Sequence, residues 1–167
     1  MYAAYDFYIT LYVNDLTEVD FNRLAWDADR MLDRATTGLD GVRKLRVAYP
    51  TDEHDADAVR RCACALVDIM RQLNAAEDNA ASASGFIETA NGLQGKVISS
   101  VSAGNESISF ATSANATATR ISAAVSDTAA REQLFIDTIV GYLDGVPDAN
   151  GVNLRYMGRY PYRVERE

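Results

Sequence analysis

The sequence predicts a mainly α-helical protein: a small bundle of about four helices with one inserted β-hairpin and an extended C-terminal tail. Two long segments carry apolar residues at intervals of three and four, the period of one face of a helix. A serine-rich stretch near residues 96–111 instead alternates polar and apolar residues, the period of a half-buried strand. We therefore expect a helical domain over residues 1–145, and a tail over residues 146–167.

The first part of the chain predicts two helices. Tyr5, Tyr8, Ile9 and Tyr12 are helically spaced, so a short aromatic helix is expected to open the fold. A long helix should begin at Thr17, whose side chain can accept a backbone N–H of the first turn, and end at Gly38. Its apolar stripe comprises Phe21, Leu24, Ala25, Ala28, Met31, Leu32 and Ala35.

A second long helix repeats the same spacing, and acidic residues between Asp52 and Asp57 suit its N-terminal end. Its stripe comprises Val59, Cys62, Ala63, Leu66, Ile69, Met70 and Leu73. The matching stripes predict that the two helices pack together. A third helix, from about Ser126 to Leu143, is apolar over a wider face and should have neighbours on more than one side. Residues 74–85 are expected to be a fraying helix end that runs into a loop, and residues 111–126 a linker or a polar helix.

The predicted hairpin has Val97 and Val101 on one face of its first strand, and Ile108 and Phe110 on one face of its second. Residues 103–106 supply a turn in which Gly or Asn can take positive φ. An isolated two-stranded hairpin is marginal in water, so it must lean on the helices or on another subunit. Both alternatives stay open at this point.

The composition indicates one soluble domain and excludes several functions. The formal net charge of −8 disfavours a nucleic-acid binder, which normally presents a basic face. No apolar run approaches the roughly 20 residues of a membrane helix. Asp6 and Thr10 interrupt the N-terminal apolar run, so we expect no signal peptide and synthesis in a reducing cytoplasm.

The sequence predicts no catalytic residue, no cofactor site and no metal site, and hence no enzyme. His54 is the one histidine, too few for most zinc sites and hydrolytic triads. Cys62 and Cys64 should point about 200° apart on a helix, so they can share neither a metal nor a disulfide. Ala90 and Val97 stand where a phosphate-binding loop needs Gly and Ser or Thr.

The order of these segments resembles the head–tail connector (adaptor) proteins of tailed bacteriophages. Their second helix has the form F-x-x-x-A-x-x-A-x-x-x-[IL]-[DN]-x-x-T, and here Phe21–Thr36 reads FNRLAWDADRMLDRAT, with Asp33 and Thr36 in their places. A Cys- or Ala-rich helix follows in the family, as VRRCACALVDIM does here. Next come a serine-rich hairpin, an amphipathic helix and a short tail with Tyr and Gly, matched here by RYMGRY.

The resemblance implies a structural virion protein in the neck, between capsid and tail, that takes part in genome ejection. Family members form a homo-oligomeric ring of subunits, expected to be a dodecamer, below the portal protein, and they bind head-closure or tail proteins. Packaged DNA passes through without tight binding, and no membrane is involved. The hairpin would bridge subunits, with its interface residues at Ser102, Gly104, Asn105, Ser107, Ser109 and Phe110.

The tail is the other predicted contact region, because aromatic and Arg residues are enriched in interface hot spots. We expect Tyr156, Arg159, Tyr160 and Tyr162 to dock on the portal, from a tail that is mobile in the monomer. The alternative is a tail folded back on its own domain. The alternative function is a cellular helical interaction or scaffold module. Genes for a portal, terminase or major capsid protein beside this one would separate the two functions.

Overall fold

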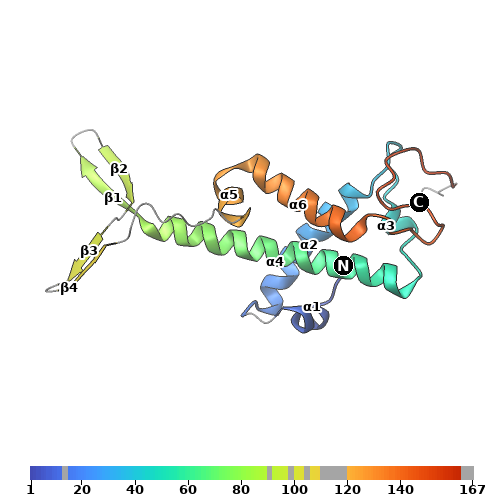
Figure 1. Cartoon of the computed structure of the whole chain (residues 1–167), viewed down its shortest axis with the longest axis horizontal. Helices are drawn as coiled ribbons and strands as arrows, with labels where there is room; N and C mark the ends of the chain where they lie inside the picture. Colours follow the sequence, from blue (N-terminus) through green and yellow to red (C-terminus); the bar gives the residue numbers. More distant parts are fainter. Residues whose placement is uncertain (13–14, 90–91, 98–99, 104–105, 110–119, 163–167) are drawn as a thin grey trace. The chain divides into compact units, whose positions relative to one another are not determined.

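A computed structural model describes residues 1–12, 15–89, 92–97, 100–103, 106–109 and 120–162, with the backbone alone over residues 79–109. This part of the chain is mainly helical, as predicted (Figure 1). The helices are α1 (Tyr5–Leu11), α2 (Glu18–Ala35), α3 (Lys44–Val47), α4 (Glu53–Ala83), α5 (Arg120–Ser126) and α6 (Thr128–Leu143). The strands are β1 (Ser84–Thr89), β2 (Gly92–Val97), β3 (Ser100–Ala103) and β4 (Glu106–Ser109).

The chain forms two compact units, which differ from the predicted domain and tail. The first comprises Met1–Arg71 with Glu132–Glu167, and the second comprises Gln72–Arg131. The long helix α4 begins in the first unit and ends in the second. The sequence did not predict this division, because the helical period continues through the boundary at residue 71 without a break. No helix of the described residues is long and apolar enough to cross a bilayer.

The predicted start of the first long helix is confirmed. Thr17 is the N-cap residue of α2, and its Oγ1 accepts the backbone N–H of Asp20 at 3.2 Å. Asp20 also places a negative charge in the first turn, where it interacts favourably with the positive end of the helix dipole. The predicted apolar stripe is largely buried, with Phe21, Ala28 and Leu32 fully so.

The core of the first unit combines five helices (α1, α2, α3, α4 and α6) with the chain that follows α6. Tyr8 of α1 packs on Phe21 of α2, with 5.1 Å between ring centroids. The other large core residues include Leu24, Leu32, Leu45, Val59, Leu66, Val67, Ile139, Leu143, Val146 and Leu154. Burying one such side chain stabilises the fold by about 1.5–3 kcal/mol relative to leaving it exposed. The last two members lie beyond α6, so the tail contributes to the core.

Helix α4 is buried more completely than its stripe predicts. All seven residues from Cys62 to Asp68 are buried, so neighbours cover this part of the helix on more than one side. The buried carboxylate of Asp68 accepts a hydrogen bond from the Tyr8 hydroxyl at 3.3 Å and pairs with Arg71 Nε at 3.1 Å. These contacts satisfy a charge that would otherwise be costly to bury.

The second unit contains two antiparallel strand pairs where the sequence predicts one hairpin. β1 pairs with β2, with Ser84 opposite Val97, and β3 pairs with β4, with Val101 opposite Ile108. The single predicted hairpin is therefore wrong: Val97 and Val101 belong to different pairs and not to one strand. Residues 84 and 85 belong to the stretch that the sequence predicts to be a fraying helix end running into a loop, because its Ala, Ser and Gly mask the β-propensity of the Phe, Ile and Thr that follow.

The predicted extended tail is also corrected. Residues 146–162, here called the C-terminal segment, fold onto the first unit beside α3 (Figure 1). Leu154 is fully buried, and Val146, Asp148 and Tyr160 are less than a tenth exposed. Residues 146–162 therefore follow the alternative prediction, a tail that folds back on its own domain. Sequence periodicity missed this because the segment makes turns and long-range contacts without forming a helix or an extended strand.

Candidate functional site

Two turns of the first unit share one conformation although about 110 residues separate them. The first Gly turn (residues 37–43) follows α2, and the second Gly turn (residues 147–153) follows α6; in each, the first and last residues form an isolated antiparallel bridge. Gly41 and Gly151 take equivalent places, with φ of 77° and 78°, a region that L side chains rarely adopt. Each glycine stands between an Asp or Asn and a Val, so the same short motif produces both turns.

Lys44 connects the first Gly turn to the C-terminal segment. Its side chain is fully buried, and its Nζ donates to the backbone oxygens of Thr36 at 2.8 Å and Leu154 at 2.9 Å. Burial lowers the pKa of Lys44, an effect that the nearby carboxylates of Asp148 and Asp40 oppose. The residue is therefore a structural cross-link between segments 110 residues apart.

The same two carboxylates also position Tyr160. Its backbone N–H donates to Asp40 Oδ2 at 2.7 Å, and its hydroxyl donates to Asp148 Oδ2. Asn150 Nδ2 in turn donates to the Tyr160 hydroxyl at 2.9 Å. Burial and then the hydrogen bond to Asp148 raise the pKa of Tyr160, so the phenol remains protonated and donates. Each Gly turn thus presents a carboxylate to one tyrosine.

The C-terminal segment approaches the end of α2 closely. Leu39 N–H donates to Met157 O at 3.1 Å. A Cβ on Gly38 would lie 2.7 Å from the backbone oxygen of Gly158, closer than real Cβ contacts. Glycine is therefore required at position 38, where any side chain would push the segment away.

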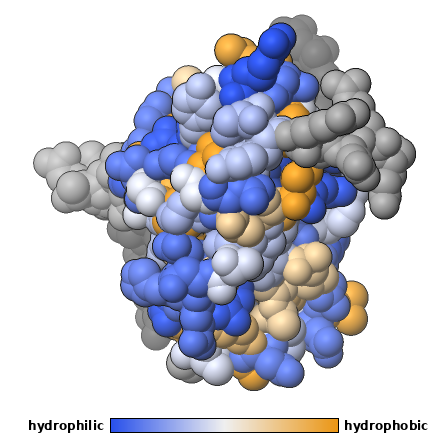
Figure 2. All heavy atoms as spheres, turned by 90° about the vertical axis from the view of Figure 1, so that its right-hand side faces the viewer, coloured by the Kyte–Doolittle hydropathy of each residue, from blue (hydrophilic) through white to orange (hydrophobic). Residues whose placement is uncertain are grey.

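The four residues predicted to dock on a partner separate into two groups. Tyr160 is buried and holds the segment in place, so it is not available for docking in this conformation. Tyr156, Arg159 and Tyr162 are exposed, and the Tyr162 ring meets Tyr160 edge-on at 5.9 Å between centroids. We call these three residues the tail surface. Figure 2 shows this side of the first unit as mostly hydrophilic, with hydrophobic side chains in small separate groups.

The residues predicted to lie between subunits fall in the other unit. Ser102 lies on β3 opposite Ser107 of β4, and Ser109 ends β4 opposite Ser100. Gly104, Asn105 and Phe110 lie outside the described residues. The structure therefore brings Ser102 and Ser107 together as a cross-strand pair, and the predicted subunit contacts remain a prediction.

Asp33 and Thr36, the two polar residues of the motif that resembles the connector family, are buried and hydrogen-bonded within the fold. Asp33 is buried on α2; it accepts a hydrogen bond from the Tyr2 hydroxyl and pairs with Arg46 Nε at 2.6 Å. Thr36 is fully buried and its Oγ1 donates to Leu32 O at 2.8 Å. The sequence identified this pair by resemblance alone. It gave no sign that Lys44 contacts Thr36, although the repeated Gly turn motif could have been found by self-comparison.

The two cysteines are core residues in the described structure. Both thiols are free and fully buried, and burial raises the pKa of each to about 12. Cys64 is buried as well as Cys62, although the two lie on different faces of α4, because neighbours cover this helix on more than one side. Among residues whose placement is described, no three His, Cys, Asp or Glu side chains are close enough to hold a metal ion.

Comparisons with protein-family models, with curated proteins and with solved structures found no match for this chain.

Proposed function

We propose that this chain is a structural subunit of the head–tail connector of a tailed bacteriophage. In this role it forms a subunit ring below the portal, extends the DNA channel and joins head to tail. The observation that carries the proposal is the order of motifs along the chain, which coincides with the order of its elements. An aromatic α1 precedes α2 with its F-x-x-x-A motif, then the Cys-rich α4, a serine-rich strand region, α6 and a Tyr- and Gly-containing end.

The motif residues of α2 support this proposal through the part they have in the fold. Asp33 and Thr36 are polar, yet both are buried with hydrogen-bond partners. Such positions tolerate few substitutions, because a buried polar group that loses its partner costs about 1–3 kcal/mol. A motif kept for this reason marks a shared fold and not a shared reaction. A structural role is therefore the one that the motif favours.

The tail surface is the proposed contact with the portal. Tyr156, Arg159 and Tyr162 project from a segment that Lys44 and Tyr160 fix to the body of the first unit. Aromatic and Arg side chains on a pre-ordered backbone lose less entropy on binding than the same residues on a mobile tail. Docking thus needs no folding of residues 146–162. The serine-rich β3–β4 region is the proposed contact between neighbouring subunits.

The proposal is tested by cosedimentation of the purified chain with DNA-filled heads that carry the portal. Tyr156→Ala, Arg159→Ala and Tyr162→Ala together should abolish attachment and leave the thermal melt near that of the wild type. Arg23→Ala with Tyr142→Ala changes the same kinds of exposed residue elsewhere and should attach normally. A truncation at Gly145 is not suitable, because it removes the buried Leu154.

Two results of this experiment count against the proposal. If the wild-type chain does not attach to portal-bearing heads, the connector function is wrong, and a cellular interaction module takes its place. If the triple variant attaches as well as the wild type does, the tail surface is not the docking site, even if the chain is a connector.

A further inference from the structure

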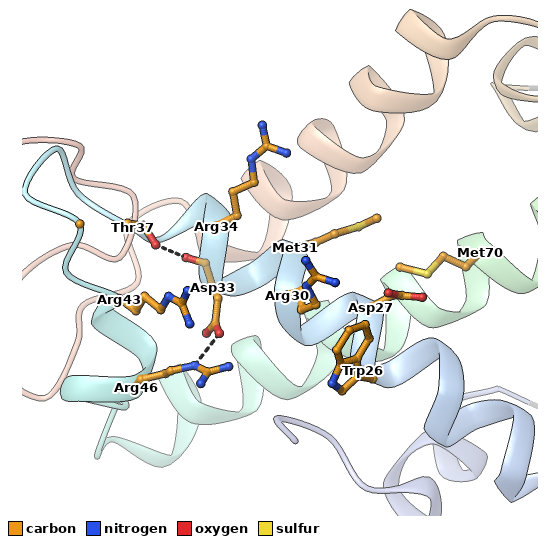
Figure 3. A pocket seen from close by; sticks show the side chains of 11 residues that line it. Trp26, Asp27, Arg30, Met31, Asp33, Arg34, Thr37, Arg43, Arg46 and Met70 are labelled. Atoms are coloured by element: carbon orange, nitrogen blue, oxygen red, sulfur yellow. Dashed lines mark hydrogen bonds and ion pairs between the residues drawn. The ribbon is translucent and has the colours of Figure 1, made fainter. Parts of the chain in front are cut away.

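An open hollow of about 1000 Å³ lies on the first unit beside α2, α3 and the first Gly turn (Figure 3). Four arginines line it (Arg30, Arg34, Arg43 and Arg46), against two carboxylates (Asp27 and Asp33). An excess of positive charge in one place is unexpected in a chain whose net charge is −8. We call this feature the arginine hollow.

Most of the positive charge in the arginine hollow is not neutralised by the chain itself. Arg46 pairs with Asp33 at 2.6 Å, whereas Arg30, Arg34 and Arg43 have no ion pair with any described residue. The Arg30 guanidinium lies 4.7 Å from the ring centroid of Trp26, a side chain that is 59% exposed. In Figure 3 Arg43 and Arg46 extend towards Asp33, and Arg34 projects away from the other guanidinium groups.

This arrangement suits a ligand with several carboxylates. Guanidinium groups bind carboxylates through two parallel hydrogen bonds, and weak hydration makes them easier to bury than ammonium groups. Trp and Arg are also among the side chains that are enriched in protein-interface hot spots. Trp26 and Arg30 lie side by side in the arginine hollow, so the hollow offers a guanidinium group for carboxylates next to an aromatic surface for a polypeptide. The arginine hollow therefore fits a short acidic peptide segment.

The chain itself carries such a segment. Residues 52–57, here called the acidic turn, read DEHDAD at the start of α4. Glu53 and Asp55 have no side-chain ion pair with any described residue, whereas Asp57 pairs with Arg60 and Arg61. Asp52 accepts the backbone N–H groups of His54 and Asp55, so its carboxylate is used within the turn. Glu53 and Asp55 are the free carboxylates.

We infer that the arginine hollow of each subunit receives the acidic turn of a second copy of this chain. This inference rests on the proposed connector ring. The two patches differ, so their contact is heterologous, and a heterologous contact between identical subunits generates a ring when its rotation closes. A two-fold dimer through either patch would place like charges together. The arrangement also accounts for a basic hollow in an acidic chain, because neighbouring copies supply the acid.

Charge-reversed variants of the full-length chain test the contact by sedimentation velocity. One variant has an acidic hollow (Arg30→Glu with Arg43→Glu), and the other has a basic turn (Glu53→Lys with Asp55→Lys). Each alone should self-associate about tenfold or more weakly than the wild type, because like charges then meet. An equimolar mixture should associate again, with the two chains alternating. Wild-type association should also weaken as salt rises.

Control variants make the same change in net charge outside both patches. Arg23→Glu with Arg120→Glu matches the first variant, and Asp15→Lys with Glu132→Lys matches the second; both should associate like the wild type. If a charge-reversed chain does not fold, Gln replaces the same residues, and each neutral variant should still lose about tenfold or more in association.

Three results would overturn the inference. If both charge-reversed variants associate as strongly as the wild type, or if the mixture of folded variants does not associate, the subunits meet through other surfaces. Attachment to portal-bearing heads would then still support the connector function. A wild-type chain that stays monomeric at millimolar concentration excludes self-docking. If the wild type binds duplex DNA and the Arg30→Glu, Arg43→Glu variant does not, nucleic acid occupies the arginine hollow instead. Failure of the connector function itself would appear separately, as loss of head attachment.

Discussion

At the scale of single residues, the fold depends on a few buried polar groups that connect distant segments. Lys44 is the clearest case, because its ammonium group is fully buried between Thr36 O and Leu154 O. Two carboxylates, Asp40 and Asp148, favour its charged form while burial opposes it. A charged donor with two carbonyl acceptors is worth more than a neutral hydrogen bond, and its loss leaves both acceptors unpaired.

Lys44→Met should lower the free energy of unfolding by about 2–4 kcal/mol, because it removes both hydrogen bonds and keeps most of the side-chain volume. Urea unfolding followed by circular dichroism measures the change. Arg23→Met is the control, since Arg23 is exposed, lies outside the arginine hollow and should change stability by no more than about 0.5 kcal/mol. A Lys44→Met chain as stable as the control would mean that the buried ammonium group contributes nothing.

The two buried thiols predict how stability depends on alkaline pH. Burial raises the pKa of Cys62 and Cys64 from 9.0 to about 12. Above pH 9 the unfolded chain therefore binds fewer protons than the folded chain, so the free energy of unfolding falls as pH rises. By pH 10 each thiol should have cost about 1.4 kcal/mol.

Cys62→Ala with Cys64→Ala should remove this contribution. Urea unfolding at pH 8 and pH 10 should show a smaller loss of stability in the variant than in the wild type. Tyrosines with raised pKa, such as Tyr49, and Lys44 with its lowered pKa titrate in both proteins, so their effects cancel in the difference. Equal losses in the two proteins would show that the thiols are not desolvated.

At the scale of elements, the sequence predicts helices well where one apolar stripe decides the structure. Thr17 and the stripe from Phe21 to Ala35 locate α2 to within a residue at its start. The second long helix is predicted correctly over residues 59–73, but α4 extends to Ala83, beyond the apolar stripe. The strands of the second unit are predicted poorly, because short Ser- and Gly-rich strands carry little hydrophobic pattern.

The C-terminal segment could not be predicted from local sequence. Its structure depends on contacts with residues about 110–120 positions away, such as Lys44 to Leu154 and Asp40 to Tyr160. Hydrophobic periodicity reports only on neighbours along the chain, so it predicts an extended tail that is mobile in the monomer. For the same reason local sequence cannot distinguish Tyr160, which is buried, from the exposed Tyr156 and Tyr162.

Two glycine substitutions test whether the C-terminal segment packs closely against Gly38. One changes Gly38 itself, and the other changes a helical glycine that has open space around it. Gly38→Ala should destabilise the chain by about 1–3 kcal/mol, because a Cβ at this site would lie 2.7 Å from Gly158 O. Gly141→Ala should be neutral or stabilising by up to about 1 kcal/mol, since a Cβ there meets nothing within 4 Å and Ala is the better helix former. Thermal unfolding compares the two. Equal melting temperatures would show that the segment does not press on Gly38.

At the scale of the whole molecule, the net charge of −8 bears directly on the proposed place beside packaged DNA. Non-specific DNA binding is driven by cations that neutralise phosphates, and this chain has few to spare. The arginine hollow is a local exception, and a neighbouring copy is proposed to fill it. An acidic subunit ring would let DNA pass without holding it.

The isolated chain should accordingly bind duplex DNA more weakly than about 10⁻⁶ M at physiological salt, the tighter end of non-specific binding. A gel-shift titration with random-sequence duplex measures this. Tight binding that weakens steeply with salt would contradict a channel that releases DNA.

The central claim is that this chain forms a subunit ring below the portal. Electron cryomicroscopy of DNA-filled, portal-bearing heads, imaged with and without the purified chain, tests it most directly. The account predicts an added ring of density on the outer end of the portal, with residues 146–162 of each copy facing the portal. The Tyr156→Ala, Arg159→Ala, Tyr162→Ala variant should leave that density absent. Heads that look the same with and without the wild-type chain, or density bound elsewhere on the capsid, would contradict the account.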